Sequence, residues 1–202
     1  MRGPRPRDIA RRLGLPLAFA GAGLTACAAI GCIAALTDPT GPVADVVVLA
    51  PSEEMRAQAL LSPPQGRPPA IAAGRAAAMR ALAQGPARAT AWLDLAYAET
   101  LRAGTVNDVA RDALRRSWVF EPLGPDDSEW RVLFALEHWG ELTPDLRDSA
   151  LAEARAVSRT GRYADMTKTL SAVRDPAGRL AANLLLMDMQ RQAERDQRKS
   201  GT

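Results

Sequence analysis

The chain has 202 residues, of which 26 are basic, 23 are acidic and one is histidine, and its formal net charge is +3. The surplus of positive charge lies at the amino terminus: residues 1–12 hold five arginines against one aspartate, and the remainder carries a net charge of −1. The bulk of the chain therefore lacks the charge of a nucleic-acid-binding protein, and we expect no nucleic-acid partner.

The first predicted element is a membrane-spanning helix over residues 13–36, a run of 24 residues without a charged side chain. A helix of that length spans about 36 Å, enough to cross a hydrocarbon core of about 30 Å. Arginines beside a first apolar segment stay in the cytoplasm, so residues 1–12 are expected to form a cytoplasmic basic tail. Lysine is rare and alanine abundant, a usage typical of GC-rich bacterial genomes. We therefore expect a bacterial inner-membrane protein with residues 37–202 in the periplasm.

Three interpretations of the apolar segment compete. We favour an uncleaved transmembrane signal anchor. The second is a lipoprotein signal, because Leu24-Thr25-Ala26-Cys27 resembles a lipobox and makes Cys27 a candidate lipidation site. The third is a cleaved secretory signal, whose apolar region is usually shorter. Cys27 and Cys32 are the only cysteines, so the exported part must fold without disulfides.

Residues 37–69 are predicted to form a proline-rich tether with one short helix. Seven prolines interrupt this region, and proline cannot donate to a helical hydrogen-bond ladder. A helix fits between Ser52 and Leu61, where Ser52 starts it and Glu53 and Glu54 lie near the positive end of its dipole.

Residues 70–198 are predicted to be helical throughout, and residues 199–202 to form a disordered tail. Glycine and proline fall between the helices, and Asp175 and Pro176 provide a cap and a first turn for the last helix. The expected helices are 70–84, 87–103, 106–119, 127–140, 144–159, 161–173 and 176–197. Apolar stripes expected to face the core are Trp130, Leu133 and Phe134; Leu146, Ala150 and Val157; and Leu180, Leu184 and Met187.

A repeat pattern runs through this helical region. The motif of the tetratricopeptide superfamily begins with Trp-x2-Leu on one helix and closes with Ala-x3-Phe-x2-Ala and Pro on the next. The matching residues are Trp92, Leu95 and Ala96; Ala110, Leu114, Ser117 and Pro122; an upstream half-repeat at Gly74, Ala78, Ala81 and Pro86; and a looser copy from Trp130 and Leu133. The chain thus resembles tetratricopeptide-repeat proteins over residues 70–160. It departs from them in a longer turn around Gly104 and in Glu99, where the family prefers an aromatic residue.

The resemblance implies an all-α fold of antiparallel helical hairpins stacked in a short array that binds protein partners. A narrower likeness concerns residues 91–157, which look like short alanine- and arginine-rich proteins from bacterial exopolysaccharide loci that carry one amino-terminal membrane segment. That likeness implies a supporting role in polysaccharide synthesis or export.

Catalytic chemistry is not expected. The exported part has one histidine, His138, and no cysteine, so we expect no zinc site of the usual kind and no other metal or cofactor. Asp127 and Glu129 are explained by their place at a helix start, where negative charge meets the positive dipole end. The chain is predicted not to be an enzyme; a cell-wall hydrolase, the catalytic alternative, would depend on Glu137 or His138.

The four tryptophans supply the candidate binding surface. Trp92 and Trp130 are interpreted as repeat-core residues, whereas Trp118 and Trp139 lie near helix ends and are the predicted partner surface. The predicted function is a membrane-anchored periplasmic adaptor that binds another envelope protein. The alternative is a lipoprotein or a glycan-contacting accessory subunit of an envelope enzyme complex.

Overall fold

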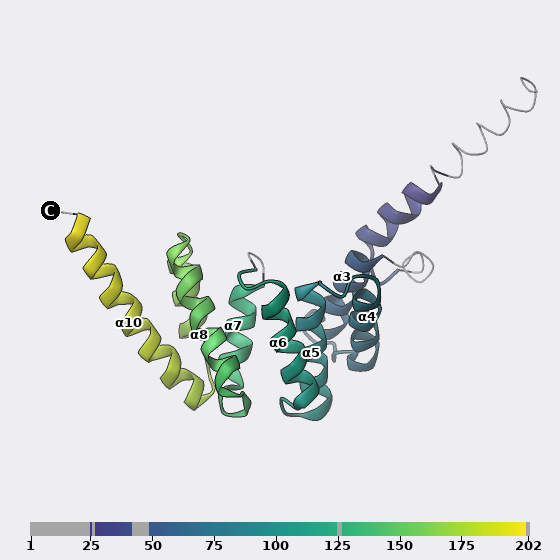
Figure 1. The fold of residues 1–202 in the computed structure, drawn as a ribbon. Coiled ribbons are helices and arrows are strands. Elements are labelled where there is room, and N and C mark those ends of the chain that lie inside the picture. The colour runs from purple at the N-terminus through teal and green to yellow at the C-terminus, as the bar shows by residue number, and fades with distance from the viewer. Residues whose placement is uncertain (1–24, 26, 42–48, 125–126, 201–202) are drawn as a thin grey trace, which may run out of the picture.

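The computed structural model describes residues 25, 27–41, 49–124 and 127–200, and its secondary structure there is helical, without strands. Residues 27–37 form an amino-terminal helix. The other helices stand side by side in chain order (Figure 1). They are α3 (Ala50–Leu61), α4 (Ile71–Gln84), α5 (Ala89–Ala103), α6 (Asp108–Phe120), α7 (Ser128–Glu137), the 3-10 turn η1 (Trp139–Glu141), α8 (Pro144–Arg159), α9 (Tyr163–Ser171) and α10 (Pro176–Ser200). The prediction of an all-α fold is confirmed for this part of the chain.

Most of the predicted anchor, residues 13–24 and 26, lies outside the described residues. Among the helices that can be described, none combines the length and the apolar character needed to cross a bilayer. In the described end of the segment, Ile30 and Ile33 are exposed by 66% and 62%.

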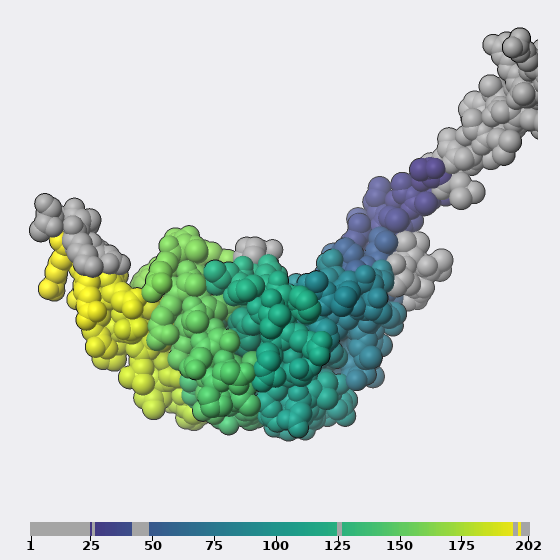
Figure 2. All heavy atoms as spheres, in the orientation of Figure 1, coloured from purple at the N-terminus to yellow at the C-terminus, as the bar shows by residue number. Residues whose placement is uncertain are grey.

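Successive helices pack in pairs. Helix α3 lies against α4, α5 against α6, and α7 against α8, while α4 also packs on α5 and joins the first pair to the second. Figure 2 shows that the packed helices form one continuous, arc-shaped body. Stacked helical hairpins require this arrangement, in which neighbouring helices pack along their lengths and short segments connect them.

The helix expected inside the tether belongs to this packed body. Leu61 of α3 is buried against α4, and a Cβ at Gly74 would lie 2.6 Å from Leu61 Cγ. Gly74 therefore allows the two helices to approach closely, as the small residues of the repeat pattern predict. Helix α3, which lies inside the predicted tether, therefore packs as part of the helical array.

The acidic start of α3 does more than complement a helix dipole. Glu53 and Glu54 are only 1% and 8% exposed. Arg80 of α4 donates to Glu53 (Nε–Oε2 3.0 Å), and Arg88, which precedes α5, donates through two nitrogens to Glu54. These ion pairs attach α3 to both neighbouring helices.

Helix ends follow local signals in the sequence. Helix α5 ends at Ala103 and is followed by Gly104, which adopts a left-handed conformation with φ 71°. The side chain of Asn107 caps α6 by accepting from Ala110 N at 2.9 Å, and Asp175 caps α10 by accepting from Gly178 N at 2.7 Å. The predicted cap at Asp175 is confirmed.

Two apolar clusters hold the body together, and α7 contributes to both. Phe134 and Ala135 belong to the cluster of α3–α6, which also includes Leu146 and Ala150 of α8, whereas Val132 and Leu136 belong to the cluster with the rest of α8, α9 and α10. Neighbouring residues of one short helix thus pack into different cores.

The predicted core face of the last helix is wrong. Leu180, Leu184 and Met187 are 63%, 58% and 54% exposed. The buried face of α10 is instead formed by Ala182, Leu185 and Met189. Helix α10 has apolar residues on two sides, and the described residues cover only one of them. The stripe predicted for α8 is confirmed, because Leu146, Ala150 and Val157 are all buried.

Candidate functional site

Trp118, one of the two predicted partner-surface residues, is buried. Its ring is only 8% exposed, and its indole Nε1 donates to Glu153 Oε2 at 2.8 Å. The position near the end of α6 predicts exposure, but the Arg131 guanidinium of α7 lies over the ring, 5.3 Å from its centroid. Trp118 therefore stabilises the interior and presents no binding surface.

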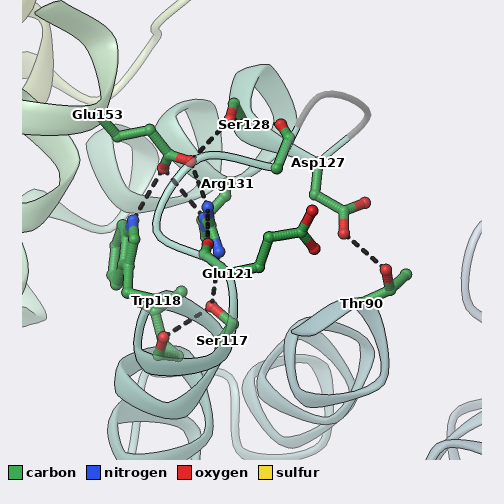
Figure 3. A network of polar contacts seen from close by, with 10 residues as sticks. Thr90, Ser117, Trp118, Glu121, Asp127, Ser128, Arg131 and Glu153 are labelled. Carbon is green, nitrogen blue, oxygen red and sulfur yellow. Dashed lines mark hydrogen bonds and ion pairs between the residues drawn. The ribbon is translucent and has the colours of Figure 1, made fainter. Parts of the chain in front are cut away.

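Glu153 and Arg131 form a buried ion pair at the centre of this interior network (Figure 3). Both side chains are at most 2% exposed. Arg131 Nε donates to Glu153 Oε2 at 3.0 Å, and a second guanidinium nitrogen donates to Oε1. Ser128 also donates to Glu153 (2.7 Å), and Arg131 reaches the carbonyl oxygen of Glu121 (2.9 Å). The network joins α6, α7 and α8, and its role is structural.

Trp139, the other predicted surface residue, lines a groove between η1, α8 and α10. The groove has a volume of about 320 Å³, and its walls include the exposed Leu180 and Leu184. The Arg147 guanidinium lies 5.5 Å from the centroid of the Trp139 ring. The two predicted tryptophans thus lie in different environments and form no common surface.

A more polar pocket lies on the side formed by the first helices of three successive pairs, α3, α5 and α7; we call this side the first-helix face. The pocket has a volume of about 270 Å³. Its lining residues are Gln58, Leu61, Ser62, Thr90, Leu93, Asp94, Tyr97, Asp127 and Trp130. The pocket is therefore built by residues from all three helices.

Asp94 is the unusual residue of this pocket. Its side chain is 9% exposed, and Oδ2 is fully buried without a hydrogen-bond partner. Burial raises the pKa of the Asp94 carboxyl well above its ordinary value, and the negative charges of Glu54 and Asp127 raise it further. A buried polar atom without a partner costs roughly 1–3 kcal/mol, so Asp94 is a poor choice for stability alone.

Asp127 faces the same pocket from the start of α7. Its position at the helix start is the one where negative charge complements the dipole, although its side chain makes no hydrogen-bonded cap to its own helix. The carboxylate accepts a hydrogen bond from Thr90 Oγ1 of α5 at 2.7 Å (Figure 3). The bond fixes a second carboxylate beside Asp94.

Aromatic rings form the remaining wall. Tyr97 and Trp130 meet edge to face with centroids 5.2 Å apart, and Trp130 stacks on Phe134 at 5.4 Å. Trp130 was interpreted as a core residue, yet it is 37% exposed. Rings held by one another present a rigid surface, which lowers the entropy cost of binding.

The residues of the catalytic alternative have structural roles. The Glu137 carboxylate accepts from the backbone N–H groups of Arg174 and Asp175, at 2.8 and 3.1 Å, and so holds the start of α10. His138 packs against Phe134, with ring centroids 4.8 Å apart. Within the described ranges, no group of three or more histidine, cysteine or acidic residues could hold a metal ion.

Sequence reasoning missed the pocket on the first-helix face. One signal was available: Asp94 interrupts an otherwise apolar stretch from Ala91 to Ala98. An acid on the packed side of a helix is rarely placed there unless it is paired. No protein-family model, curated protein or solved structure matches the chain.

Proposed function

We propose that this protein is a membrane-anchored adaptor of the bacterial cell envelope that binds a segment of a partner protein on its first-helix face. Residues 13–36 are the proposed anchor, and residues 37–202 are proposed to lie in the periplasm. The pairing of α3 with α4, α5 with α6 and α7 with α8 supports assignment to the tetratricopeptide-like helical-repeat proteins.

The single observation that carries this proposal is the pocket of α3, α5 and α7, where exposed aromatic surface adjoins a buried carboxyl group without a partner. Aromatic residues with exposed faces are enriched where proteins bind one another. A membrane anchor would raise the effective concentration of any membrane-bound partner and so compensate for a small binding surface.

In-cell photo-crosslinking tests the binding face. A photoreactive phenylalanine analogue replaces Trp130, and in a matched control it replaces Ala83, which is exposed on α4 outside the pocket. We expect the first variant to give a discrete crosslinked product in membranes and the control to give none. Equal labelling at both positions, or none at position 130, would contradict the adaptor proposal.

A separate experiment tests the anchor. Alkaline phosphatase fused after Thr202 is expected to be active, because that enzyme folds only outside the cytoplasm. Mass measurement of the mature amino terminus then separates an intact anchor from a chain that begins at an acylated Cys27. An active cytoplasmic reporter at the same position would refute the assigned topology.

The proposal of a role in polysaccharide synthesis or export depends on the sequence likeness alone. A glycan-contacting function has less support, because Trp118, one of the two tryptophans predicted to be exposed, is buried. The adaptor is therefore the function that the geometry supports best.

A further inference from the structure

The pocket on the first-helix face combines negative charge with aromatic walls. Asp94 and Asp127 both line it, and its described lining residues include no arginine, lysine or histidine. Glu54 on α3 also acts on Asp94, but Arg88 already neutralises Glu54 through two hydrogen bonds. The charge left without a counter-ion in the described pocket belongs to the two aspartates.

The size of the pocket limits what it can hold. Sites for small-molecule ligands commonly have volumes of about 300–1,000 Å³. At about 270 Å³ and partly open, this pocket is better suited to one side chain than to a free ligand enclosed on all sides.

We propose that the pocket receives the cationic side chain of a lysine or arginine from the bound partner segment, with Asp94 as its counter-ion and the rings of Tyr97 and Trp130 beside its alkyl stem. An ammonium or guanidinium group supplies the positive charge that the lining of Asp94 and Asp127 lacks, and aromatic faces attract cations. This inference rests on the proposed adaptor function and adds to it the chemistry that the partner must present.

Cation binding should be linked to the titration of Asp94. Burial and the two neighbouring acids, Glu54 on α3 and Asp127 before α7, raise the pKa of Asp94 above its ordinary value. A bound cation favours the carboxylate and so lowers that pKa. Affinity should therefore fall as the pH is lowered.

Titration of the full chain in detergent micelles tests the inference with defined probes. The probes are n-butylammonium and n-propylguanidinium, which reproduce the two side chains, and 1-butanol, a neutral molecule of similar shape. The chain has four tryptophans, so an NMR spectrum of its indole N–H groups contains four signals. A Trp130→Phe variant assigns the reporter signal, and the buried Trp118 serves as an internal reference.

We expect the two cations to shift the Trp130 signal saturably and butanol to leave it unchanged. Asp94→Asn should weaken cation binding about tenfold or more and remove its pH dependence. Asp145→Asn, which changes an exposed carboxylate paired with Arg115, should bind as the wild type does. Circular dichroism establishes that each variant is folded.

Two results would overturn the inference. One is cation binding that Asp94→Asn leaves intact. The other is a Trp130 shift caused by butanol or by a neutral oligosaccharide but not by the cations, which would assign the pocket to another ligand. The crosslinking experiment at position 130 remains independent: crosslinks without cation binding remove this inference alone, whereas cation binding without crosslinks removes the adaptor proposal.

Discussion

The buried ion pair between Arg131 and Glu153 gives the most demanding test of how this array is held together. Substituting Arg131→Met leaves the Glu153 carboxylate in the interior, with only Trp118 and Ser128 to donate to it. Substituting Glu153→Gln leaves the Arg131 guanidinium without its counter-ion, and the single amide oxygen replaces only one of the two carboxylate oxygens that accept from Trp118 and Ser128. Each variant therefore isolates one buried charge.

The expected loss is large because neither charge can reach water. Removal of one partner of a buried pair costs about 3–5 kcal/mol, against a typical total stability of about 5–15 kcal/mol. The double variant Arg131→Met/Glu153→Leu removes both charges. The Ser128 hydroxyl can still donate to the carbonyl oxygen of Gly124, whereas the Trp118 N–H loses its acceptor and the Glu121 carbonyl oxygen loses the Arg131 donor. We expect the double variant to cost about 1–3 kcal/mol, less than either single change.

Urea unfolding of the full chain in mild detergent, followed by circular dichroism at 222 nm, measures these differences. Asp145→Asn is the matched control, because it breaks an arginine–carboxylate pair whose side chains are 44% and 57% exposed, and it should cost less than about 1 kcal/mol. If the single changes at Arg131 and Glu153 cost no more than this control, or if their losses simply add in the double variant, the reasoning about burial is refuted.

Three further predictions concern single positions. Gly178→Ala should destabilise the packing of α10 by about 1–3 kcal/mol or more, because its Cβ would lie 1.8 Å from the carbonyl oxygen of Leu136. The control Gly140→Ala meets no atom within 4 Å and should be tolerated. Hydrogen exchange of the α10 amides measures the difference, and equal protection in the two variants would contradict the packing. Asp94→Asn should raise the melting temperature at neutral pH. The pKa of Asp94 is raised in the folded state, so the wild type loses stability as the pH rises above the unfolded value of 3.8. Melting curves recorded across a pH series should show a smaller loss in the variant. Burial opposes the ionisation of Glu99, but hydrogen bonds from Arg75 and Arg102 lower its pKa overall. The contribution of Glu99 to folding stability is therefore present above the unfolded pKa of 4.5 and is lost as the pH falls. Glu99→Gln should reduce that loss of stability in acid, and an unchanged pH profile would contradict this account.

Helix positions could be predicted because they depend on local periodicity and on glycine and proline between the periodic segments. Helix α8 matches its predicted range residue for residue, and the small residues of the repeat pattern, such as Ala78, Ala96 and Ala110, are buried as expected. The signals involved lie within one or two turns of the residues they explain.

The polar contacts could not be predicted in the same way, because their partners lie far apart in the sequence. Glu53 pairs with Arg80, 27 residues away, and Asp127 accepts from Thr90, 37 residues away. Read locally, such acids look like charges at a helix start. The covered side of α10 was unpredictable for a related reason: both sides carry apolar residues, and only tertiary packing decides between Leu184 and Leu185.

The division of α7 between two apolar clusters has a practical consequence for anyone who would dissect this protein. If the chain is divided between α6 and α7, the amino-terminal fragment lacks Phe134 and Ala135, which belong to its apolar cluster. The same two side chains are then exposed to solvent on the carboxyl-terminal fragment. A cut after α7 would take Val132 and Leu136 from the carboxyl-terminal half. The ten residues of α7 complete both apolar clusters, so neither half of the array should fold stably without the other.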